Sequence, residues 1–313
     1  MTALTDPSVV GGLCERVVGR RRELEVLIAA LAADRHVLLE GPPGTGKSTI
    51  LREVAAAAGT GFVFVEGNAE LTPARLAGQF DPSRILEDGY SEDVFVDGPL
   101  VEALRNGSLL YVEELNRVPE ETVNLLITVM SEGELTLPRL GRIEAADGFR
   151  LVAAMNPFDN IGTARVSGAV YDRMCRISMG YQSLDDESDI VVRNTTADDR
   201  KLRKRAVTIT RATRTHGDVR VGSSVRGAID LVEVAHQLAS MRGLPVHDAD
   251  LGLDAALTSL SGRIRLHEGG DKTPEGVITE LWEAVLAAEQ PRADDETDSG
   301  KATAPDGATA APR

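Results

Sequence analysis

The sequence predicts an α/β fold in which a parallel sheet is flanked by helices and followed by a smaller, all-helical domain. In residues 1–182, short and almost continuous apolar runs alternate with segments of helical periodicity, which is typical of parallel strands covered on both faces. After residue 182 the strand-like runs vanish and helical spacing takes over. We therefore expect an α/β nucleotide-binding domain at 1–182, a helical lid domain at 183–289 and a disordered tail at 290–313. The tail mixes Pro, Ala, Gly and acidic residues without periodicity, so it cannot bury enough apolar surface to fold.

The elements of the first domain follow one another in a regular order. A helix is expected over 17–33, where leucines recur at helical steps. A buried strand at 36–40 leads through a Gly/Pro cluster into a helix that ends at Gly59. The other expected elements are strands at 62–65, 108–112, 149–155 and 175–179, and a helix at about 120–130. The five strands predict a five-stranded parallel sheet.

Two amphipathic segments predict the helical domain. Val225, Ile229 and Val232 recur at helical spacing, and Ser224 is available as an N-cap. A second helix is expected after Pro274, because apolar residues again recur there at steps of four.

Composition and charge limit the function classes. The chain of 313 residues has 34 Lys and Arg against 49 Asp and Glu, which gives a net charge of −15. This balance argues against a broad grip on nucleic acid or on anionic membranes, since both need clustered cations. No stretch reaches the roughly 18 apolar residues of a membrane span, and two cysteines cannot build a disulfide framework. We expect a soluble, cytoplasmic protein, with Cys175 buried inside its strand.

A phosphate-binding loop lies between the first strand and its helix. The segment matches the pattern G-x-x-x-x-G-K-[ST] in the strand–loop–helix context that this motif requires. Glycines let successive backbone N–H groups point inward, and the helix N-terminus adds positive charge. Lys47 would reach the β- and γ-phosphates, and Ser48 would bind Mg²⁺. The nucleotide-binding candidates are Gly41, Pro42, Pro43, Gly44, Thr45, Gly46, Lys47, Ser48 and the adjacent Thr49.

A second apolar strand ends in two carboxylates. The run LLYVEE ends in Glu113 and Glu114, as a P-loop NTPase requires for its metal and its attacking water. Glu113 would act on the metal side and Glu114 as the general base. A solvated turn or helix start is the competing interpretation of this acidic pair.

These segments together resemble a known family. The loop GPPGTGKST and the blocks YVEELNRVP, AAMNPFDNIGT and VYDRM occur in the order and spacing of an AAA+ ATPase module. EELNRVP with MNP and an Asp-Arg ending is similar to the MoxR-type branch, which is related to magnesium-chelatase ATPase subunits and dynein-like AAA modules. The resemblance covers residues 15–240. It departs at Glu113, because the acidic pair of this family normally begins with Asp.

The resemblance implies further site residues. Asn156 matches the polar residue that aligns the attacking water, although it could also cap the turn before a proline. Arg173 matches the arginine that reaches a neighbouring subunit's γ-phosphate, with Arg165 as a weaker candidate; a surface arginine paired with an aspartate is the alternative. Arg226 matches the sensor 2 arginine of the lid, against an exposed arginine near an acid. Val18 and Gly19 resemble the segment that packs beside adenine.

The resemblance also implies partners and a motor function. It predicts a Mg²⁺-dependent ATPase that assembles into a ring, a hexamer by family likeness. This ring would remodel or activate a partner protein, or insert a cofactor into it. A protein with a von Willebrand factor A domain is the implied partner. The segments at 80–98 and 135–148 sit where MoxR-type proteins carry an insert and a hairpin, which could contact a client or could be ordinary surface loops.

Three other functions stay open at this point, of which the narrowest is a metal-chelatase subunit that would need a tetrapyrrole-binding partner. A DNA-directed AAA+ motor is possible because some relatives with the same insert are helicases, although the charge disfavours it. A slow, nucleotide-gated binding switch is suggested by Glu113 in place of Asp.

Overall fold

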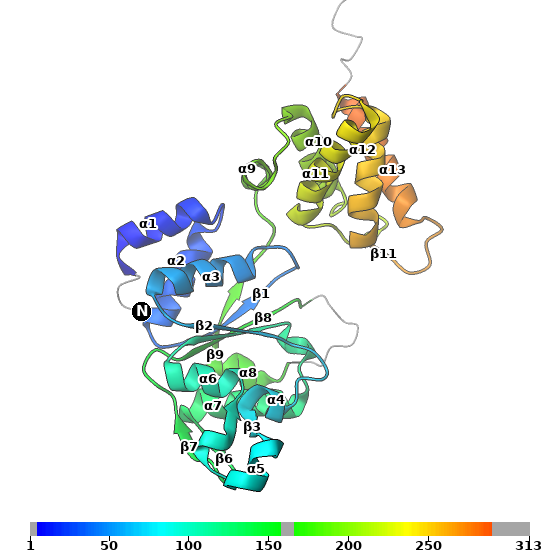
Figure 1. Ribbon diagram of the computed structural model, residues 1–313. Helices are drawn as coiled ribbons and strands as arrows, with labels where there is room; N and C mark the ends of the chain where they lie inside the picture. The colour runs from blue at the N-terminus through cyan, green and yellow to red at the C-terminus, as the bar shows by residue number, and fades with distance from the viewer. Residues whose placement is uncertain (1–4, 158–165, 290–313) are drawn as a thin grey trace, which may run out of the picture. The chain divides into compact units, whose positions relative to one another are not determined.

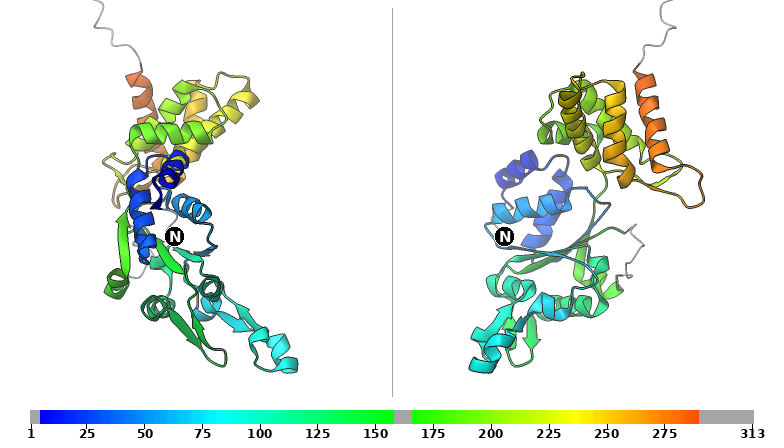
Figure 2. Two further views of the ribbon diagram at one scale, coloured as in Figure 1. Left: turned by 90° about the vertical axis from the view of Figure 1, so that its left-hand side faces the viewer. Right: turned by 45° about the vertical axis from the view of Figure 1, so that its right-hand side comes forward.

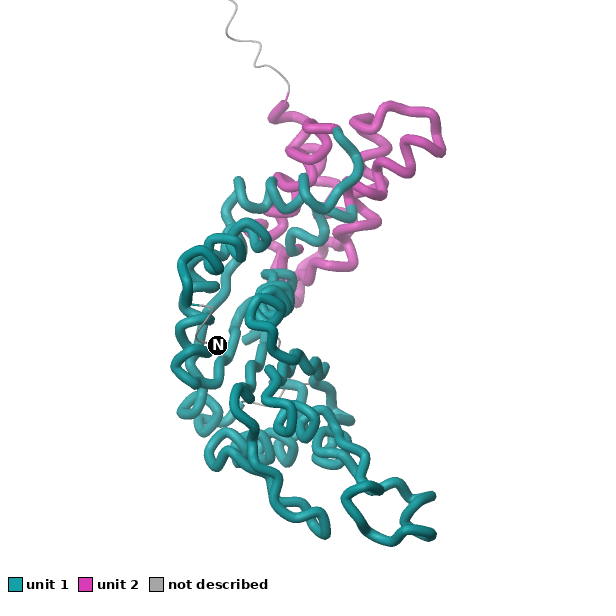
Figure 3. The backbone as a smooth tube through the Cα atoms, turned by 60° about the vertical axis from the view of Figure 1, so that its left-hand side comes forward, with its two compact units in different colours: residues 1–198, 224–230 teal, residues 199–223, 231–313 magenta. Residues whose placement is uncertain are grey.

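The computed structural model describes residues 5–157 and 166–289, so the expected tail at 290–313 lies outside the described residues. The chain divides into two compact units, which Figure 3 colours separately. Unit 1 comprises residues 1–198 and 224–230, and unit 2 comprises residues 199–223 and 231–313. The domain boundary expected after residue 182 stays a prediction.

Unit 1 is built on a five-stranded sheet (Figure 1). Each pair of neighbouring strands is parallel, which confirms the predicted α/β class. The strand order is β2 (Phe62–Glu66), β5 (Leu109–Glu113), β8 (Arg150–Met155), β1 (His36–Glu40) and β9 (Met174–Ser178).

Helices cover both faces of this sheet. The apolar residues of the strands alternate between two cores: Leu109 and Tyr111 belong to one, and Leu110 and Val112 belong to the other. The first core includes residues of α1 (Pro7–Arg16), α2 (Arg21–Ala32) and α3 (Lys47–Ala58). The second core includes residues of α4 (Pro73–Ala77), α6 (Pro99–Asn106), α7 (Glu120–Glu132) and α8 (Gly168–Arg173). The sequence analysis missed α1, whose start is fixed by the Asp6 side chain as an N-cap.

Two short excursions extend from the same end of unit 1 (Figures 1 and 2). The first consists of β3 (Gly78–Phe80), α5 (Pro82–Asp88), the 3₁₀ turn η2 (Glu92–Val94) and β4 (Phe95–Asp97), with β3 and β4 paired antiparallel. The second is the hairpin of β6 (Glu134–Leu137) and β7 (Gly141–Glu144). They coincide with the two segments expected at 80–98 and 135–148. The turn after β5 is the 3₁₀ helix η3 (Leu115–Arg117), and α9 (Leu184–Asn194) follows β9.

Unit 2 is predominantly helical. Its helices are α10 (Arg200–Ala212), most of α11 (Val225–Arg242), α12 (Ala249–Leu260) and α13 (Pro274–Ala288), with a short 3₁₀ turn η4 (Ser261–Arg263). The expectation that strands vanish after residue 182 was wrong in detail. Beyond β9, two short strands, β10 (Val219–Val221) and β11 (Arg265–Leu266), pair antiparallel. They are too short to give a periodic signal. Within 5–157 and 166–289, no helix is long and apolar enough to cross a membrane.

Cys175 is exposed, so its expected burial was wrong. It lies on β9, which is an edge strand of the sheet. In this strand only Met174 and Ile177 are buried, and the intervening side chains are exposed. Edge strands present a partly solvated surface, and an apolar run alone does not distinguish them from central strands.

Candidate functional site

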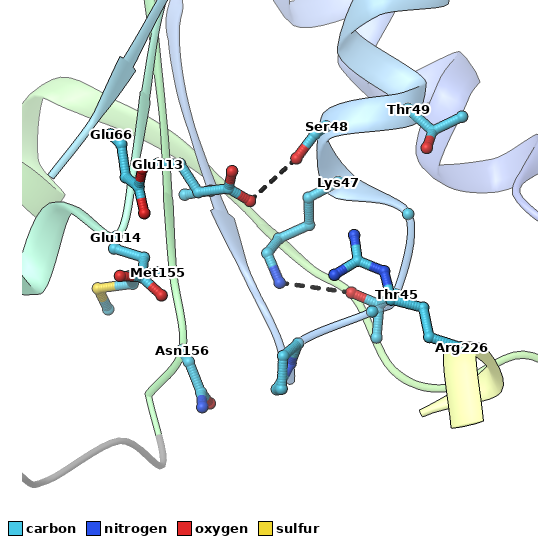
Figure 4. A pocket seen from close by; sticks show the side chains of 14 residues that line it. Thr45, Lys47, Ser48, Thr49, Glu66, Glu113, Glu114, Met155, Asn156 and Arg226 are labelled. Atoms are coloured by element: carbon cyan, nitrogen blue, oxygen red, sulfur yellow. Dashed lines mark hydrogen bonds between the residues drawn. The ribbon is translucent and has the colours of Figure 1, made fainter. Parts of the chain in front are cut away.

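A pocket opens at the carboxyl ends of four parallel strands (Figure 4). β1 leads into the glycine-rich loop, β2 and β5 end in Glu66 and Glu113, and β8 is followed by Asn156. These groups lie far apart in the sequence but line one pocket, because parallel strands bring their carboxyl ends to the same edge of the sheet.

The glycine-rich loop wraps around one side of the pocket. Its residues from Pro43 to Thr49 line the pocket. Gly44 and Gly46 have φ angles of 70° and 86°, in the left-handed region that favours glycine. A Cβ atom on Gly44 would lie 2.3 Å from the Ser224 Oγ atom, so a larger residue does not fit there. Helix α3 begins at Lys47, and the N–H groups of its first turn make this mouth favourable for an anion.

Lys47 is held inside the loop. Its side chain is 8% exposed, and Nζ donates hydrogen bonds to the carbonyl oxygens of Gly41 at 2.9 Å and Pro42 at 2.8 Å. Gly41 and Pro42 therefore act on the site through their backbone. Burial lowers the pKa of Lys47 to about 8, and the nearby charge of Glu113 opposes that shift. The ammonium is thus confined beside the helix N-terminus.

Ser48 and Glu113 meet directly across the pocket. The Ser48 hydroxyl donates to Glu113 Oε1 at 2.9 Å (Figure 4). This contact joins the first turn of α3 to the end of β5. A hydroxyl and a carboxylate are hard oxygen donors of the kind that Mg²⁺ takes in nucleotide sites. The residues present therefore fit a magnesium ion that would complete its coordination with nucleotide phosphate and water.

Tyr111 also reaches this contact, which the sequence analysis did not predict. Its hydroxyl lies 3.3 Å from Ser48 Oγ, and its side chain is fully buried. Burial raises the pKa of Tyr111 well above its ordinary value, so the hydroxyl stays protonated at physiological pH. The available sequence signal was the spacing of two residues from Glu113, which places both side chains on one face of β5.

Glu114 adopts an unusual backbone conformation. Its φ angle is 53°, in the left-handed region that a non-glycine residue occupies at a cost of roughly 1–3 kcal/mol. Its carboxylate lies 2.7 Å from an Nη atom of Arg117 and lines the pocket. The backbone here turns the second carboxylate away from the direction of the strand.

Asn156 and Arg226 complete the pocket lining. The Asn156 carbonyl accepts a hydrogen bond from Asn116 Nδ2 at 3.4 Å, which links the ends of β8 and η3. Arg226 lies in the first turn of α11, in the part of this helix that belongs to unit 1. Glu66 is a further lining carboxylate that the sequence analysis missed. Its only signal was its position at the end of an apolar strand.

Other predicted residues lie away from this pocket. The Arg173 Nε atom donates to Ser131 Oγ at 2.6 Å, and Nη1 donates to the Ala169 carbonyl at 3.1 Å. Val18 and Gly19 are not in the pocket lining. A Cβ atom on Gly19 would collide with Asp186, so this segment packs against the start of α9. Arg165 lies outside the described residues.

A glycine-rich loop after a central parallel strand, with a carboxylate at the end of a strand one position further along the sheet, is the arrangement of a P-loop nucleotide-binding module. Residues 36–174 match the model of the AAA domain family, dynein-related subfamily. The chain therefore contains a domain of this family. It is 29% identical over 306 residues to the uncharacterized protein YeaC of Bacillus subtilis, covering 86% of this chain and 91% of that protein. It is 30% identical over 207 residues to an uncharacterized protein of Staphylococcus haemolyticus, covering 64% and 78% of the two chains.

A solved structure shares the fold. The RuvB Holliday junction branch migration motor of Thermotoga maritima superposes with a TM-score of 0.51 at 16% sequence identity. The superposition covers 76% of this chain and 68% of that chain. At this identity the likeness concerns the fold alone.

The position of the acidic pair depends on Gly67, and Gly67→Ala tests this dependence. The Gly67 N–H donates to the Glu113 carbonyl at 2.7 Å. An added Cβ would lie 2.5 Å from the Glu114 carbonyl oxygen and 2.6 Å from that of Glu113. We expect Gly67→Ala to lower the free energy of unfolding by about 1–3 kcal/mol, the usual cost of overpacking. Denaturant unfolding measures this change.

Gly180→Ala is the matched control. Position 180 has open space around an added Cβ and no positive φ. We expect its unfolding free energy to stay within about 0.5 kcal/mol of wild type. Equal effects of the two substitutions would contradict the close approach at Gly67.

Proposed function

We propose that this protein is a Mg²⁺-dependent ATPase of the MoxR type that works as a ring on a partner protein. The Ser48–Glu113 hydrogen bond of 2.9 Å carries the proposal. It brings the hydroxyl of the phosphate-binding loop to the carboxylate of the acidic strand, which is where a P-loop NTPase holds its metal. Family membership supports nucleotide binding at the same loop.

The lining residues would bind phosphate, bind the metal ion or activate the attacking water. Lys47 would exchange its loop carbonyl partners for the β- and γ-phosphates, while Ser48 and Glu113 would hold Mg²⁺. The bound ion would neutralise charge that develops on the phosphates. Glu114 would accept the proton of the attacking water, and Asn156 would orient that water. Both residues line the pocket beside the loop, which supports these assignments.

Arg226 would contact the γ-phosphate from the same pocket. A cationic side chain in the first turn of a helix is unfavourable for the helix dipole, so a bound anion would compensate it. Val18 and Gly19 would pack beside the adenine ring, outside the pocket that holds the phosphates.

Arg173 would act on the nucleotide of a neighbouring subunit. It lies at the end of α8, outside the pocket of its own chain, with its side chain 35% exposed. An arginine fork suits this role, because it spreads positive charge over several phosphate oxygens. A ring, hexameric as the resemblance implies, would place Arg173 of one subunit at the site of the next.

The two excursions of unit 1 would contact the client. The Phe80 ring makes edge-to-face contacts with the rings of Tyr90 and Phe95, with centroids 5.1 Å apart in each pair. Arg139 of the hairpin lies over the Tyr90 ring at 3.7 Å, so the hairpin and the insert are joined. Leu86 is 90% exposed on the insert. This joined, partly apolar surface supports contact with a protein client, and the resemblance implies a partner with a von Willebrand factor A domain.

The main alternative is a slow nucleotide-gated switch. Its motivation is Glu113 in place of Asp. The contact with Ser48 weakens this motivation, because the longer side chain still reaches the position where the metal would bind. The likeness to a branch migration motor carries no argument for DNA, since it concerns the fold alone.

ATP hydrolysis as a function of protein concentration tests the proposal. We expect the specific activity to rise with concentration, because Arg173 acts only across a subunit contact. Arg173→Ala should reduce turnover by about 10³-fold or more while ATP binding is retained. Lys47→Ala should abolish binding, and Glu114→Gln should retain binding without turnover. A coupled phosphate assay and equilibrium dialysis with ATP measure the two properties.

Arg35→Ala is the matched control for Arg173→Ala. Arg35 is exposed and precedes β1, at the amino end of the sheet opposite to the pocket. Its removal should leave turnover unchanged. Wild-type protein that binds ATP but does not hydrolyse it at any concentration would contradict the ring ATPase and favour the switch.

The pH dependence of ADP binding tests the role of Lys47. In the nucleotide-free protein, burial lowers the pKa of Lys47 from its ordinary value of 10.5 to about 8. Phosphate binding favours the charged form, so ADP affinity should be constant below pH 8. Above pH 8 the free protein loses the proton, and the dissociation constant should rise by up to about tenfold per pH unit. Calorimetric titration from pH 7.5 to 9.5 measures this; a flat profile would contradict it.

A further inference from the structure

Tyr111 carries a hydroxyl within the fully buried stretch of a central strand. β5 is buried from Leu109 to Val112, and Leu109 and Tyr111 belong to the core that packs against α3. The Tyr111 ring lies 6.0 Å from that of Phe62 and 5.7 Å from that of Phe64. A phenylalanine would fill the same space, so packing does not explain the hydroxyl.

The hydroxyl is directed at the metal end of the site. A buried tyrosine hydroxyl needs a hydrogen-bond partner. Here the partner is Ser48 Oγ at 3.3 Å, and the same Oγ donates to Glu113 Oε1 at 2.9 Å. Tyr111 and Glu113 are two residues apart on β5, so both side chains point to the side of the sheet where α3 begins.

We infer that Tyr111 is a positioning residue for the metal site, whose hydroxyl fixes Ser48 and Glu113 in the orientation that binds Mg²⁺. This inference rests on the proposed nucleotide site. Glu113 has one more rotatable bond than the aspartate expected at this position, and an additional contact restricts that freedom. The Tyr111 hydroxyl restricts the rotamers of Ser48, and Ser48 in turn restricts those of Glu113 through their hydrogen bond.

The test compares metal binding with nucleotide binding. The probes are ADP in EDTA, followed by calorimetry, and Mn²⁺ with saturating ADP, followed by electron paramagnetic resonance. In Tyr111→Phe, we expect the Mn²⁺ dissociation constant to rise by about tenfold, the usual effect of losing an outer partner of a metal ligand. The ADP dissociation constant in EDTA should change by less than about twofold, because Lys47 and the loop amides are untouched.

Tyr171→Phe is the matched control. Tyr171 also has its hydroxyl on a carboxylate, donating to Glu40 Oε1 at 2.7 Å, but outside the pocket lining. Each variant loses one hydrogen bond of a tyrosine hydroxyl, so each should lower the melting temperature by about 2–4 °C. Only Tyr111→Phe should weaken Mn²⁺ binding.

The outcomes are distinct. An unchanged Mn²⁺ dissociation constant in Tyr111→Phe would overturn the inference, and so would an equal loss of ADP affinity in EDTA, since that would indicate general damage. Wild-type protein that binds neither ADP nor Mn²⁺·ADP would instead refute the proposed function.

Discussion

The contact between Ser48 and Glu113 is the interaction on which the rest of the site depends. It joins the N-terminus of α3 to the end of β5, although α3 follows β1 and these two strands belong to separate βα units. The contact requires β1 and β5 to be parallel and separated only by β8, which the observed strand order provides. Because the strands are parallel, the other lining residues at their carboxyl ends, Glu66 and Asn156 among them, lie at the same edge of the sheet.

Close packing of backbone around the pocket keeps this arrangement fixed. Gly44 lies against Ser224, and Gly67 lies against the carbonyls of the acidic pair, so two turns approach to distances that any side chain would prevent. The Glu114 backbone, with its positive φ angle, lies in the same closely packed region, because its carbonyl oxygen is one of the atoms that Gly67 approaches. Such strain persists only where the surroundings determine it, and it is concentrated at functional positions in many proteins. Burial of Lys47 adds an electrostatic cost that an anion would relieve.

Local patterns in the sequence predicted the sheet and much of the pocket. Apolar runs predicted all five parallel strands, the three central ones and the two at the edges alike. The loop motif and the acidic strand end singled out Ser48 and Glu113, which the structure brings into contact, and the roles assigned to these residues stay predictions. Edge position, by contrast, depends on strand order, so Cys175 was wrongly expected to be buried. The strands β10 and β11 depend on pairing across a long connection, which no local period reports.

Tyr111 and Glu66 show the same limit within the site. Tyr111 lies in a predicted strand and Glu66 at the end of another, but the Ser48 hydroxyl beside Tyr111 and the pocket that Glu66 lines are formed by distant segments. In the sequence, Tyr111 cannot be distinguished from the other residues of a buried apolar run. Its position beside Ser48 follows only from the packing of α3 against β5, whereas the phosphate-binding loop is recognisable from its own residues.

A crystal structure with Mg²⁺ and ADP would show whether this pocket binds nucleotide through Lys47 and the metal ion through Ser48 and Glu113. We expect the β-phosphate at the N-terminus of α3, within hydrogen-bond distance of Lys47 Nζ, and the ion bound to Ser48 Oγ on the side of Glu113. An ADP molecule bound elsewhere, or an ion that contacts neither Ser48 nor Glu113, would refute this assignment of the site.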